Sequence, residues 1–358
     1  MAQALAEAKK GLGRTSPNPC VGAVIVSDGV EISRGYHKKA GTPHAEIHAL
    51  NKAGGKAKGA TIYVTLEPCN HTGRTPPCSH AVAAAGIKRV VVGMTDPNPL
   101  VSGSGLDYLR ANGVDVISGV LEKECRELNL PFLKHITSGL PYVIMKAGIS
   151  LDGKLSYQKG ISGKITGPES LHRLHELRNT VDAILVGSGT QLADNPSLTT
   201  RRGDDAKDPL RVVLDSSLRI SPDAKILHLS SAAPTLIVCT EKAEPQKIAL
   251  LQKLNNVQVQ VIEHDDDGRI SLLSLLRFLG EKGICSLLVE GGAEVHSSFL
   301  RKGLIDRVML FVAPLFAGSE GTPLLTDFPI TEREAAPLLK HVQYIPCGDD
   351  ILVQGDLH

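Results

Sequence analysis

The residues best suited to chemistry in this sequence are one histidine, one glutamate and two cysteines in its first quarter. His44 and Glu46 stand two residues apart, and Cys69 and Cys78 each directly follow a proline. One imidazole and two thiolates give zinc three protein ligands and leave a fourth position for water. Zinc lowers the pKa of such a water, so that it attacks an amidine-like ring carbon near neutral pH. Glu46 is then placed to carry a proton to the departing ammonia.

This chemistry requires the ends of helices. Residues two apart do not share a face within a helix, so His44 and Glu46 converge only at a helix end. Pro43 favours a helix start there, because proline is tolerated in the first turn. Cys78 follows Pro76-Pro77 at another predicted helix start, where the helix N-terminus lowers the pKa of a thiol and favours the thiolate.

Two interpretations without catalysis remain open. The site could be a closed structural zinc site with a fourth ligand from His48, His71 or His80, or the cysteines could be unrelated core residues beside a solvated glutamate. A structural site has no use for a glutamate at position 46, which favours the catalytic interpretation. The pattern also matches the H-x-E…P-C-x-x-C signature of zinc deaminases, except that eight residues separate Cys69 from Cys78.

The residues around this cluster resemble one family closely. The runs SPNPCVGAVIV, GYHKKAGTPHAE and PCNHTGRTPPC are similar to the bifunctional riboflavin-biosynthesis deaminase/reductase family, and the resemblance covers nearly the whole chain. It implies that Asn18 binds the pyrimidine and that the segment between the cysteines helps to hold the substrate. His71, Arg74 and Thr75 offer hydrogen-bond donors for a ribose phosphate, although such residues are also typical of a solvated loop.

The first domain is expected over residues 1–140 as a cytidine-deaminase-like three-layer sandwich. Alternating helices and apolar strands predict an α/β fold with a largely parallel sheet covered on both faces. The predicted helices are 1–10, 44–53, 79–85, 106–111 and 121–137, and the predicted strands are 21–26, 61–65, 89–94 and 114–118. Glycine and proline in Ser138-Gly139-Leu140-Pro141 end the last helix and mark a domain boundary.

The second domain is expected over residues 141–358 as another α/β unit with an antiparallel end. A strand begins at PYVIMKAGI, and a hairpin is predicted from 342–345 and 351–354. The other predicted strands are 183–186, 211–214, 235–238, 257–262, 286–289 and 307–312, and the helices are 170–179, 245–253, 272–282 and 295–302. The polar stretches 204–208 and 263–267 are interpreted as solvated loops.

A glycine pair supplies the main chemical signal of the second domain. Gly291-Gly292 follows the apolar strand at 286–289 and precedes a helix, an arrangement that lets the backbone approach a pyrophosphate. A glycine pair is also common in a tight turn. Because the G-x-G-x-x-G pattern is absent, no Rossmann domain is predicted.

The stretches MKAGISLDGK, ISGKITGPES, LRNTVDAILVGSGTQLADNPSLTTR and VEGGAEVHSSF resemble the reductase domain of the same family. The resemblance implies a dihydrofolate-reductase-like fold and the cofactor NADPH. It places the cofactor on Gly148, Lys164, Thr190, Asp194, Ser216, Gly292, Ala293, Glu294, Val295, His296, Ser297 and Ser298. It places the substrate on Ser162, Arg178, Leu198, Arg201 and Glu290. Lys164 departs from the family, which often has tryptophan there, and this removes a stacking contact with the cofactor.

Several charged residues of this half have more than one interpretation. Arg178 and Arg201 suit a phosphate clamp, because a guanidinium fork matches phosphate oxygens, but both could be ordinary surface charges. Asp152 precedes a glycine and could be a turn residue. Lys164, Ser216 and Arg219 are the candidates for recognising the 2′-phosphate of NADPH.

Composition narrows the class of protein. The 358 residues carry a net charge of +1 and only 3% aromatic residues, which favours a small-molecule partner over nucleic acid. Seven cysteines, no signal-peptide pattern at the start and no membrane-length apolar run predict a reducing, cytoplasmic location.

We therefore expect a zinc- and NADPH-dependent bifunctional enzyme that first deaminates 2,5-diamino-6-ribosylamino-4(3H)-pyrimidinone 5′-phosphate and then reduces its ribosyl group to ribityl. The expected partners are this phosphorylated pyrimidine and further copies of the chain, with no nucleic acid or membrane. The alternatives are a nucleic-acid or nucleoside deaminase with a non-catalytic second domain, and a zinc protein in which either half has lost activity.

Overall fold

The structure is a computed structural model that describes residues 1–71, 76–98, 102–161, 163–203 and 205–357. Contacts within the chain separate it into two compact units, Met1–Leu140 and Pro141–His358. Three of the predicted substrate residues, Arg74, Thr75 and Ser162, lie outside the described residues.

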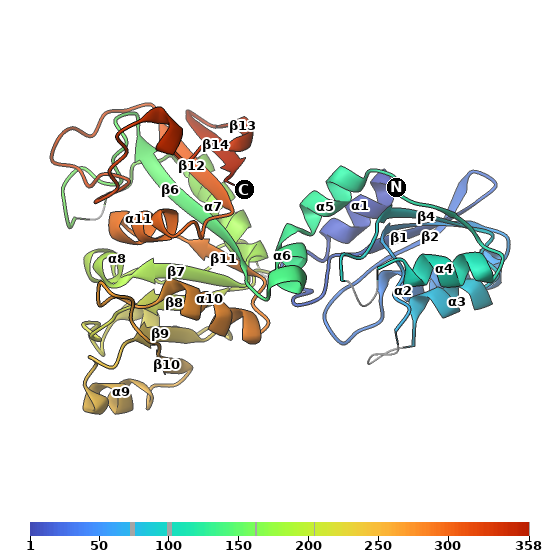
Figure 1. The fold of residues 1–358 in the computed structure, drawn as a ribbon, viewed down its shortest axis with the longest axis horizontal. Helices are drawn as coiled ribbons and strands as arrows, with labels where there is room; N and C mark the ends of the chain where they lie inside the picture. The colour runs from blue at the N-terminus through green and yellow to red at the C-terminus, as the bar shows by residue number, and fades with distance from the viewer. Residues whose placement is uncertain (72–75, 99–101, 162, 204, 358) are drawn as a thin grey trace. The chain divides into compact units, whose positions relative to one another are not determined.

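The first unit is built on a five-stranded sheet in the order β2-β1-β3-β4-β5 (Figure 1). Its strands are β1 (Gly22–Ser27), β2 (Val30–Tyr36), β3 (Thr61–Leu66), β4 (Arg89–Met94) and β5 (Asp115–Ile117). β1 pairs antiparallel with both β2 and β3, whereas β3, β4 and β5 are parallel. The prediction of a largely parallel sheet is therefore right for one half of this sheet and wrong for the other.

The antiparallel half arises from a hairpin that the sequence analysis missed. Asp28 and Gly29 both have positive φ, at 51° and 78°, as the favoured two-residue hairpin turns require. β2 alternates buried with exposed residues and carries Glu31 and Arg34, so it lacks the continuous apolar run of β1. The Asp-Gly pair after an apolar strand is the feature of the sequence that could have indicated this hairpin.

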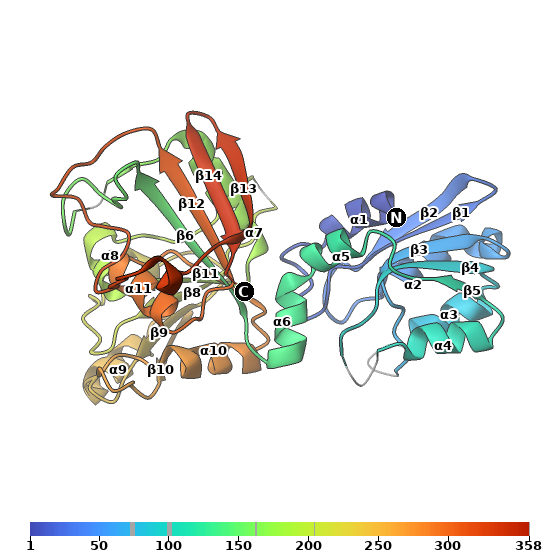
Figure 2. The ribbon, with the colours of Figure 1, turned by 45° about the horizontal axis from the view of Figure 1, so that its top comes forward.

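Helices cover both faces of this sheet (Figures 1 and 2). α1 (Ala2–Lys9) and α5 (Glu122–Leu128) lie on one face. The other face carries α2 (Ala45–Ala53), α3 (Cys78–Ala84) and α4 (Ser104–Ala111). The fold therefore has three layers, as predicted, and it includes the predicted helix starts at residues 44 and 78.

The predicted helix at 121–137 is two helices, α5 and α6 (Leu130–Ser138), separated at Asn129. Pro131 cannot donate a backbone hydrogen bond, and its ring disfavours continuation from the preceding helix. The amide of Asn129 turns inward, where it accepts from the Cys20 N–H at 2.8 Å and donates to the Cys20 carbonyl at 3.1 Å. The break thus ties the end of the first unit to the segment before β1.

The second unit contains a nine-stranded sheet in the order β10-β9-β8-β7-β11-β6-β12-β14-β13. Its strands are β6 (Tyr142–Ser150), β7 (Ala183–Gly187), β8 (Leu210–Leu214), β9 (Thr235–Cys239), β10 (Val257–Val261), β11 (Ser286–Val289), β12 (Arg307–Ala313), β13 (Lys340–Cys347) and β14 (Asp350–Asp356). The strands from β10 to β12 pair in parallel, and the β13–β14 hairpin adds the antiparallel end. The predicted hairpin and parallel core are confirmed.

The helices α7 to α11 lie against this sheet (Figure 2). They are α7 (Pro168–Thr180), α8 (Ser188–Asp194), α9 (Pro245–Leu251), α10 (Leu272–Glu281) and α11 (Ala293–Arg301). α8 was not predicted, because its seven residues, SGTQLAD, carry little apolar periodicity. It begins directly at the carboxyl end of β7, and this position matters for the second site.

The cores are aliphatic. In the first unit they are built from residues such as Ile25, Ile62 and Val92, each fully buried.

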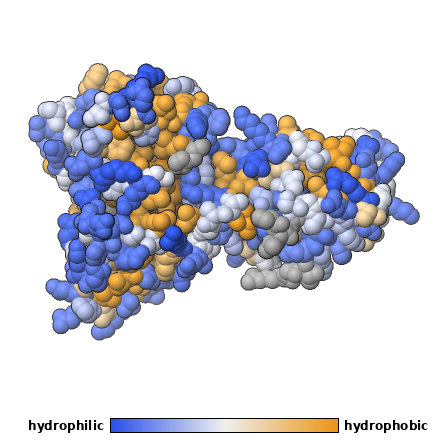
Figure 3. All heavy atoms as spheres, in the orientation of Figure 1, coloured by the Kyte–Doolittle hydropathy of each residue, from blue (hydrophilic) through white to orange (hydrophobic). Residues whose placement is uncertain are grey.

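In the second unit, apolar side chains also gather on the surface over the region of β6, β12 and β14 (Figure 3). Among the helices that the structure describes, none is long and apolar enough to cross a membrane.

Candidate active sites

His44, Cys69 and Cys78 converge from three separate segments of the first unit. His44 is the N-cap of α2, Cys69 follows β3, and Cys78 is the first residue of α3. The His44 Nδ1 atom lies 3.2 Å from the Cys78 Sγ atom and 3.6 Å from the Cys69 Sγ atom. Zinc bonds of about 2.0–2.3 Å in a tetrahedral site give ligand separations of this size. The donor set and its spacing therefore fit zinc.

The two cysteine side chains interact and shift each other's pKa in opposite directions. A hydrogen bond from the Cys78 thiol, with further support from His44, lowers the pKa of Cys69 to about 4. Its contact with Cys69, together with burial, raises the pKa of Cys78. The backbone N–H of Cys78, at the start of α3, also points to the Cys69 sulfur at 3.4 Å. A divalent cation bound here would hold both sulfurs as thiolates.

Glu46, the predicted proton-transfer residue, lies beside this ligand set. Its side chain is buried, and desolvation raises its pKa to about 7, while the nearby charge of His44 opposes that rise. A carboxyl group with a pKa near neutrality both takes up and releases protons readily. Glu46 therefore has the protonation behaviour of a general acid–base group.

The described residues do not close the metal site with a fourth ligand. Among the described residues, the group of possible metal ligands whose donor atoms all lie within 4.8 Å of one another consists of His44, Cys69 and Cys78. His80 instead stacks on the ring of Tyr108 at 4.0 Å, and the Nε2 atom of His48 is buried without a hydrogen-bond partner. The interpretation as a closed structural site is therefore not supported by the donors that the structure places here.

His37 connects the predicted pyrimidine-binding residue to the metal site, and the sequence analysis missed it. The Asn18 Nδ2 atom lies 3.1 Å from the His37 Nε2 atom, and the His37 Nδ1 atom lies 3.3 Å from the carbonyl of Pro43. The His37 ring also meets the His44 ring edge-on at 5.2 Å. Burial lowers the pKa of His37, so the ring is held neutral.

Glu67 is a second residue that the sequence analysis did not single out. Its buried carboxylate accepts the backbone N–H groups of Asp96, Gly103 and Gly105 at 2.9–3.1 Å. Gly105 is required there, because a Cβ atom would lie 2.1 Å from the carbonyl of Pro68. These contacts fix the turn that carries Cys69. A glutamate directly after an apolar strand and two residues before a ligand was the available signal.

The second unit contains a cavity of about 830 Å³. It opens where β7, β8 and β11 end and where α8 and α11 begin. Ligands of parallel sheets bind at such carboxyl ends, and helix N-termini favour anionic groups there. The cavity is therefore suited to a phosphate-bearing cofactor.

Most of the predicted cofactor residues line this cavity, but four do not. The lining includes Thr190, Asp194, Ser216, Gly292, Ala293, Glu294, Val295 and Ser298, together with Arg219 from the 2′-phosphate candidates. Outside the lining are Gly148, Lys164, His296 and Ser297. Lys164 is exposed, whereas His296 is fully buried with neither ring nitrogen hydrogen-bonded. The Ser297 hydroxyl accepts the N–H of Thr326 at 2.8 Å.

The glycine pair allows this end of the sheet to pack closely. A Cβ atom on Gly291 would lie 2.6 Å from the Cβ atom of Val295, and one on Gly187 would lie 2.7 Å from the same side chain. Gly292 is the N-cap of α11 and faces the Thr190 hydroxyl, 3.1 Å from where its own Cβ atom would be. Both predicted interpretations of the pair, a tight turn and a close approach to the ligand site, are compatible with this geometry.

Arg178 and Glu290 form a buried bidentate ion pair. The Arg178 Nε and NH2 atoms donate to the two Glu290 oxygens, each at 2.8 Å, and the NH1 atom donates to the Thr199 carbonyl at 3.1 Å. Burial alone would raise the pKa of Glu290, but Arg178 holds it below its usual range. Arg178 thus keeps Glu290 ionised and holds the segment at Thr199.

Arg201 differs from Arg178 and Leu198 in exposure. Arg201 is exposed, and its backbone N–H donates to the His175 Nδ1 atom at 3.2 Å. Leu198 is buried and has a φ of 51°, an uncommon conformation for a residue other than glycine. Burial lowers the pKa of His175, the charges of Arg178 and Arg201 lower it further, and the charge of Glu290 opposes this.

Lys146 completes this charged group, although the sequence analysis did not single it out. It lies on β6. Burial lowers its pKa, whereas the negative charge of Glu290 opposes that change. Its ammonium lies 5.6 Å from the centre of the Phe311 ring. A lysine inside the apolar run YVIMKAGIS was the available signal, because lysine is rarely buried without a partner.

The two halves of the chain match two protein families. Residues 1–94 match the cytidine and deoxycytidylate deaminase zinc-binding region, and residues 141–353 match the RibD C-terminal domain. The chain belongs to the RibD family. The riboflavin biosynthesis protein RibD of Aquifex aeolicus is 44% identical over 99% of this chain and 96% of its own length.

Solved structures agree with this family over the whole chain. The RibD of Acinetobacter baumannii (form 1) aligns with a TM-score of 0.89 at 37% identity, covering 100% of this chain and 97% of that one. A diaminohydroxyphosphoribosylaminopyrimidine deaminase/5-amino-6-(5-phosphoribosylamino)uracil reductase of Thermotoga maritima aligns with a TM-score of 0.86 at 37% identity and the same coverage. The predicted family, fold classes and enzyme classes are confirmed. As a RibD-family protein, the chain is a zinc-dependent deaminase and an NADPH-dependent reductase.

The ligand assignment in the first unit leads to a test of metal content. We expect Cys69→Ser to lose most of the bound zinc and to lower the melting temperature of the first unit, because metal-binding energy is also folding energy. Zinc per chain is measured by elemental analysis and unfolding by calorimetry. Cys20→Ser is the matched control, since Cys20 is a buried thiol outside the cluster. Full zinc occupancy in Cys69→Ser would refute the assignment.

Proposed function

We propose that the chain catalyses two consecutive reactions of riboflavin biosynthesis. The first unit deaminates 2,5-diamino-6-ribosylamino-4(3H)-pyrimidinone 5′-phosphate, and the second reduces the ribosyl group of the product to ribityl. The observation that carries this proposal is the pairing, in one chain, of a His-Cys-Cys metal set beside Glu46 with a cofactor-sized cavity at the starts of α8 and α11. Family membership favours it over a nucleic-acid deaminase with a non-catalytic second domain.

In the first reaction, water adds to the ring carbon that bears the amino group, and ammonia leaves. His44, Cys69 and Cys78 would hold the zinc ion, which when bound would activate the water. Glu46 takes a proton from the water and returns it to the departing amino group. Asn18, held by His37, is proposed to hydrogen-bond the pyrimidine, and His71, Arg74 and Thr75 are proposed to hold its ribose phosphate.

In the second reaction, the sugar carbon must be fixed beside the nicotinamide of NADPH, which supplies the hydride. The proposed cofactor residues are those named above, and those of the GG turn and of α8 line the cavity. We propose that Arg201 anchors the substrate phosphate and that Glu290, kept ionised by Arg178, accepts a hydrogen bond from the substrate. Ser162 and Leu198 remain proposed substrate contacts.

The role of Glu46 is tested by an isosteric change. Glu46→Gln removes the proton acceptor while preserving shape, so we expect deamination to fall by about 10²–10⁴-fold. Zinc content and reductase turnover should stay at wild-type values, because Glu46 is neither a proposed ligand nor part of the second unit. Both half-reactions and the metal content are measured on the same preparation. Near-normal deaminase turnover would refute the assignment.

The two arginines are tested by separating affinity from turnover. We expect Arg201→Ala to raise the KM for the phosphorylated substrate, and Arg178→Ala to lower kcat because Glu290 loses its partner. Each change should reduce kcat/KM for reduction by about ten- to a hundredfold, as for a lost charge-assisted contact. Deaminase activity of the same variants is the control. Unchanged reduction in both variants would show that the substrate is held elsewhere.

We also propose that copies of this chain associate through the edge of the second sheet. β13 is a terminal strand, and its Tyr344 side chain is 72% exposed beside exposed Val342 and Ile351. An uncovered apolar edge strand invites pairing with another chain. We expect Tyr344→Glu to shift the sedimentation coefficient toward that of a monomer, with Tyr157→Glu as a control at another exposed tyrosine. A wild-type chain that sediments as a monomer would refute this association.

We place the protein in the cytoplasm. None of the seven cysteines, all of which lie within the described residues, forms a disulfide, as a reducing compartment allows. Fractionation of cells that express the chain checks this location.

A further inference from the structure

A buried arginine lies behind the segment that carries Leu198 and Arg201. Arg211, on β8, is 1% exposed and takes no part in the sites described above. Its Nε atom donates to the Thr235 hydroxyl at 3.0 Å, and its NH1 atom donates to the Ser231 hydroxyl at 3.3 Å. Its NH2 atom contacts the carbonyl of Ala233. These contacts hold the guanidinium in one place.

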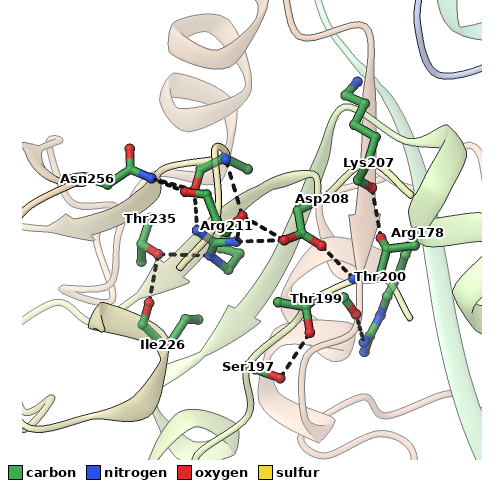
Figure 4. Close-up of polar contacts among 12 residues, drawn as sticks. Arg178, Ser197, Thr199, Thr200, Lys207, Asp208, Arg211, Ile226, Thr235 and Asn256 are labelled. Carbon is green, nitrogen blue, oxygen red and sulfur yellow. Dashed lines mark hydrogen bonds and ion pairs between the residues drawn. The ribbon is translucent and has the colours of Figure 1, made fainter. Parts of the chain in front are cut away.

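Asp208 connects this buried arginine to the substrate segment (Figure 4). Its Oδ2 atom lies 3.8 Å from the Arg211 NH1 atom and accepts the Ser231 hydroxyl at 2.6 Å. Its Oδ1 atom accepts the backbone N–H of Thr200 at 2.7 Å. One carboxylate thus attaches the backbone beside Arg201 to a residue that is fixed within the core.

The same segment is held at several other points. The Thr200 hydroxyl donates to the Lys207 carbonyl at 2.9 Å, and the Lys207 N–H donates to the Asn179 side chain at 2.9 Å. On the other side of Thr200, the Thr199 carbonyl accepts from Arg178 at 3.1 Å. The segment needs such support because Leu198 has a φ of 51°, which persists only where the surroundings enforce it.

We propose that Asp208, fixed by Arg211, is a positioning residue that sets the place of Arg201 and of the Thr199 carbonyl for the second reaction. The inference rests on the reductase function proposed above. Asp208 touches neither a proposed substrate group nor the cofactor cavity. It acts through the Thr200 backbone, which lies between the carbonyl that receives Arg178 and the residue that is to anchor the phosphate.

The first test separates positioning from a general loss of stability. We expect Asp208→Ala to raise the KM for the ribosylaminopyrimidine phosphate by about tenfold while the KM for NADPH changes less than about twofold. Asp208→Asn should lie between wild type and Asp208→Ala, because its remaining oxygen still accepts the Thr200 N–H. Asp306→Asn is the matched control, since Asp306 also accepts a backbone N–H, that of Val143 near the start of β6. The proposal would be overturned if Asp208→Ala raised the KM for NADPH as much as the KM for the substrate. It would also be overturned if Asp306→Asn raised the substrate KM as much as Asp208→Ala does.

The second test asks whether Asp208 acts through Arg201. In a double-mutant cycle on the substrate KM, Asp208→Ala should have a much smaller effect when Arg201 is already alanine. Additive effects would overturn the positioning role. If Arg201→Ala alone leaves the KM unchanged, the proposed anchor is wrong. If Arg201→Ala is impaired and Asp208→Ala is not, only the positioning proposal fails.

Discussion

Both sites depend on one constraint: the N-terminal ends of helices lie beside the functional groups of each site. His44 is the N-cap of α2 and Cys78 is the first residue of α3, so two ligands from distant segments meet without sharing a helix face. In the second unit, α8 and α11 begin beside the cavity. A helix start presents backbone N–H groups and a partial positive charge, which favours thiolates in one unit and phosphates in the other.

The balance between burial and a neighbouring positive charge sets the pKa of the buried glutamate at each site, with opposite results. In the first unit, Glu46 has a raised pKa because desolvation outweighs the nearby charge of His44. In the second unit, Glu290 is buried as well, but Arg178 outweighs desolvation and keeps it ionised. The same residue type therefore suits proton transfer in one site and fixed negative charge in the other. The neighbouring cation decides which role is available.

The second site also depends on residues that do not touch the ligand space. Glu290 is oriented by Arg178, Arg178 also holds the Thr199 carbonyl, and the following residue is bound by Asp208. This series of hydrogen bonds attaches an irregular segment to the rigid sheet. Positioning of this kind matters to turnover, because a small displacement of a reacting group slows a reaction strongly.

The sequence by itself determined the metal donors, the glycine pair, most of the strands and the resemblance to a bifunctional family. These features are local: a proline before a ligand, an apolar run before Gly291, or a motif of fixed spacing. The sequence did not predict β2, the break at Asn129 or the roles of His37, Glu67 and Lys146. The contacts of Asn129 and His37 depend on partners elsewhere in the chain, Cys20 for Asn129 and Asn18 for His37. β2, in contrast, directly follows β1 across the Asp28-Gly29 turn. Tertiary structure also brought Arg178, which from its charge alone suited a phosphate clamp, into a buried ion pair with Glu290.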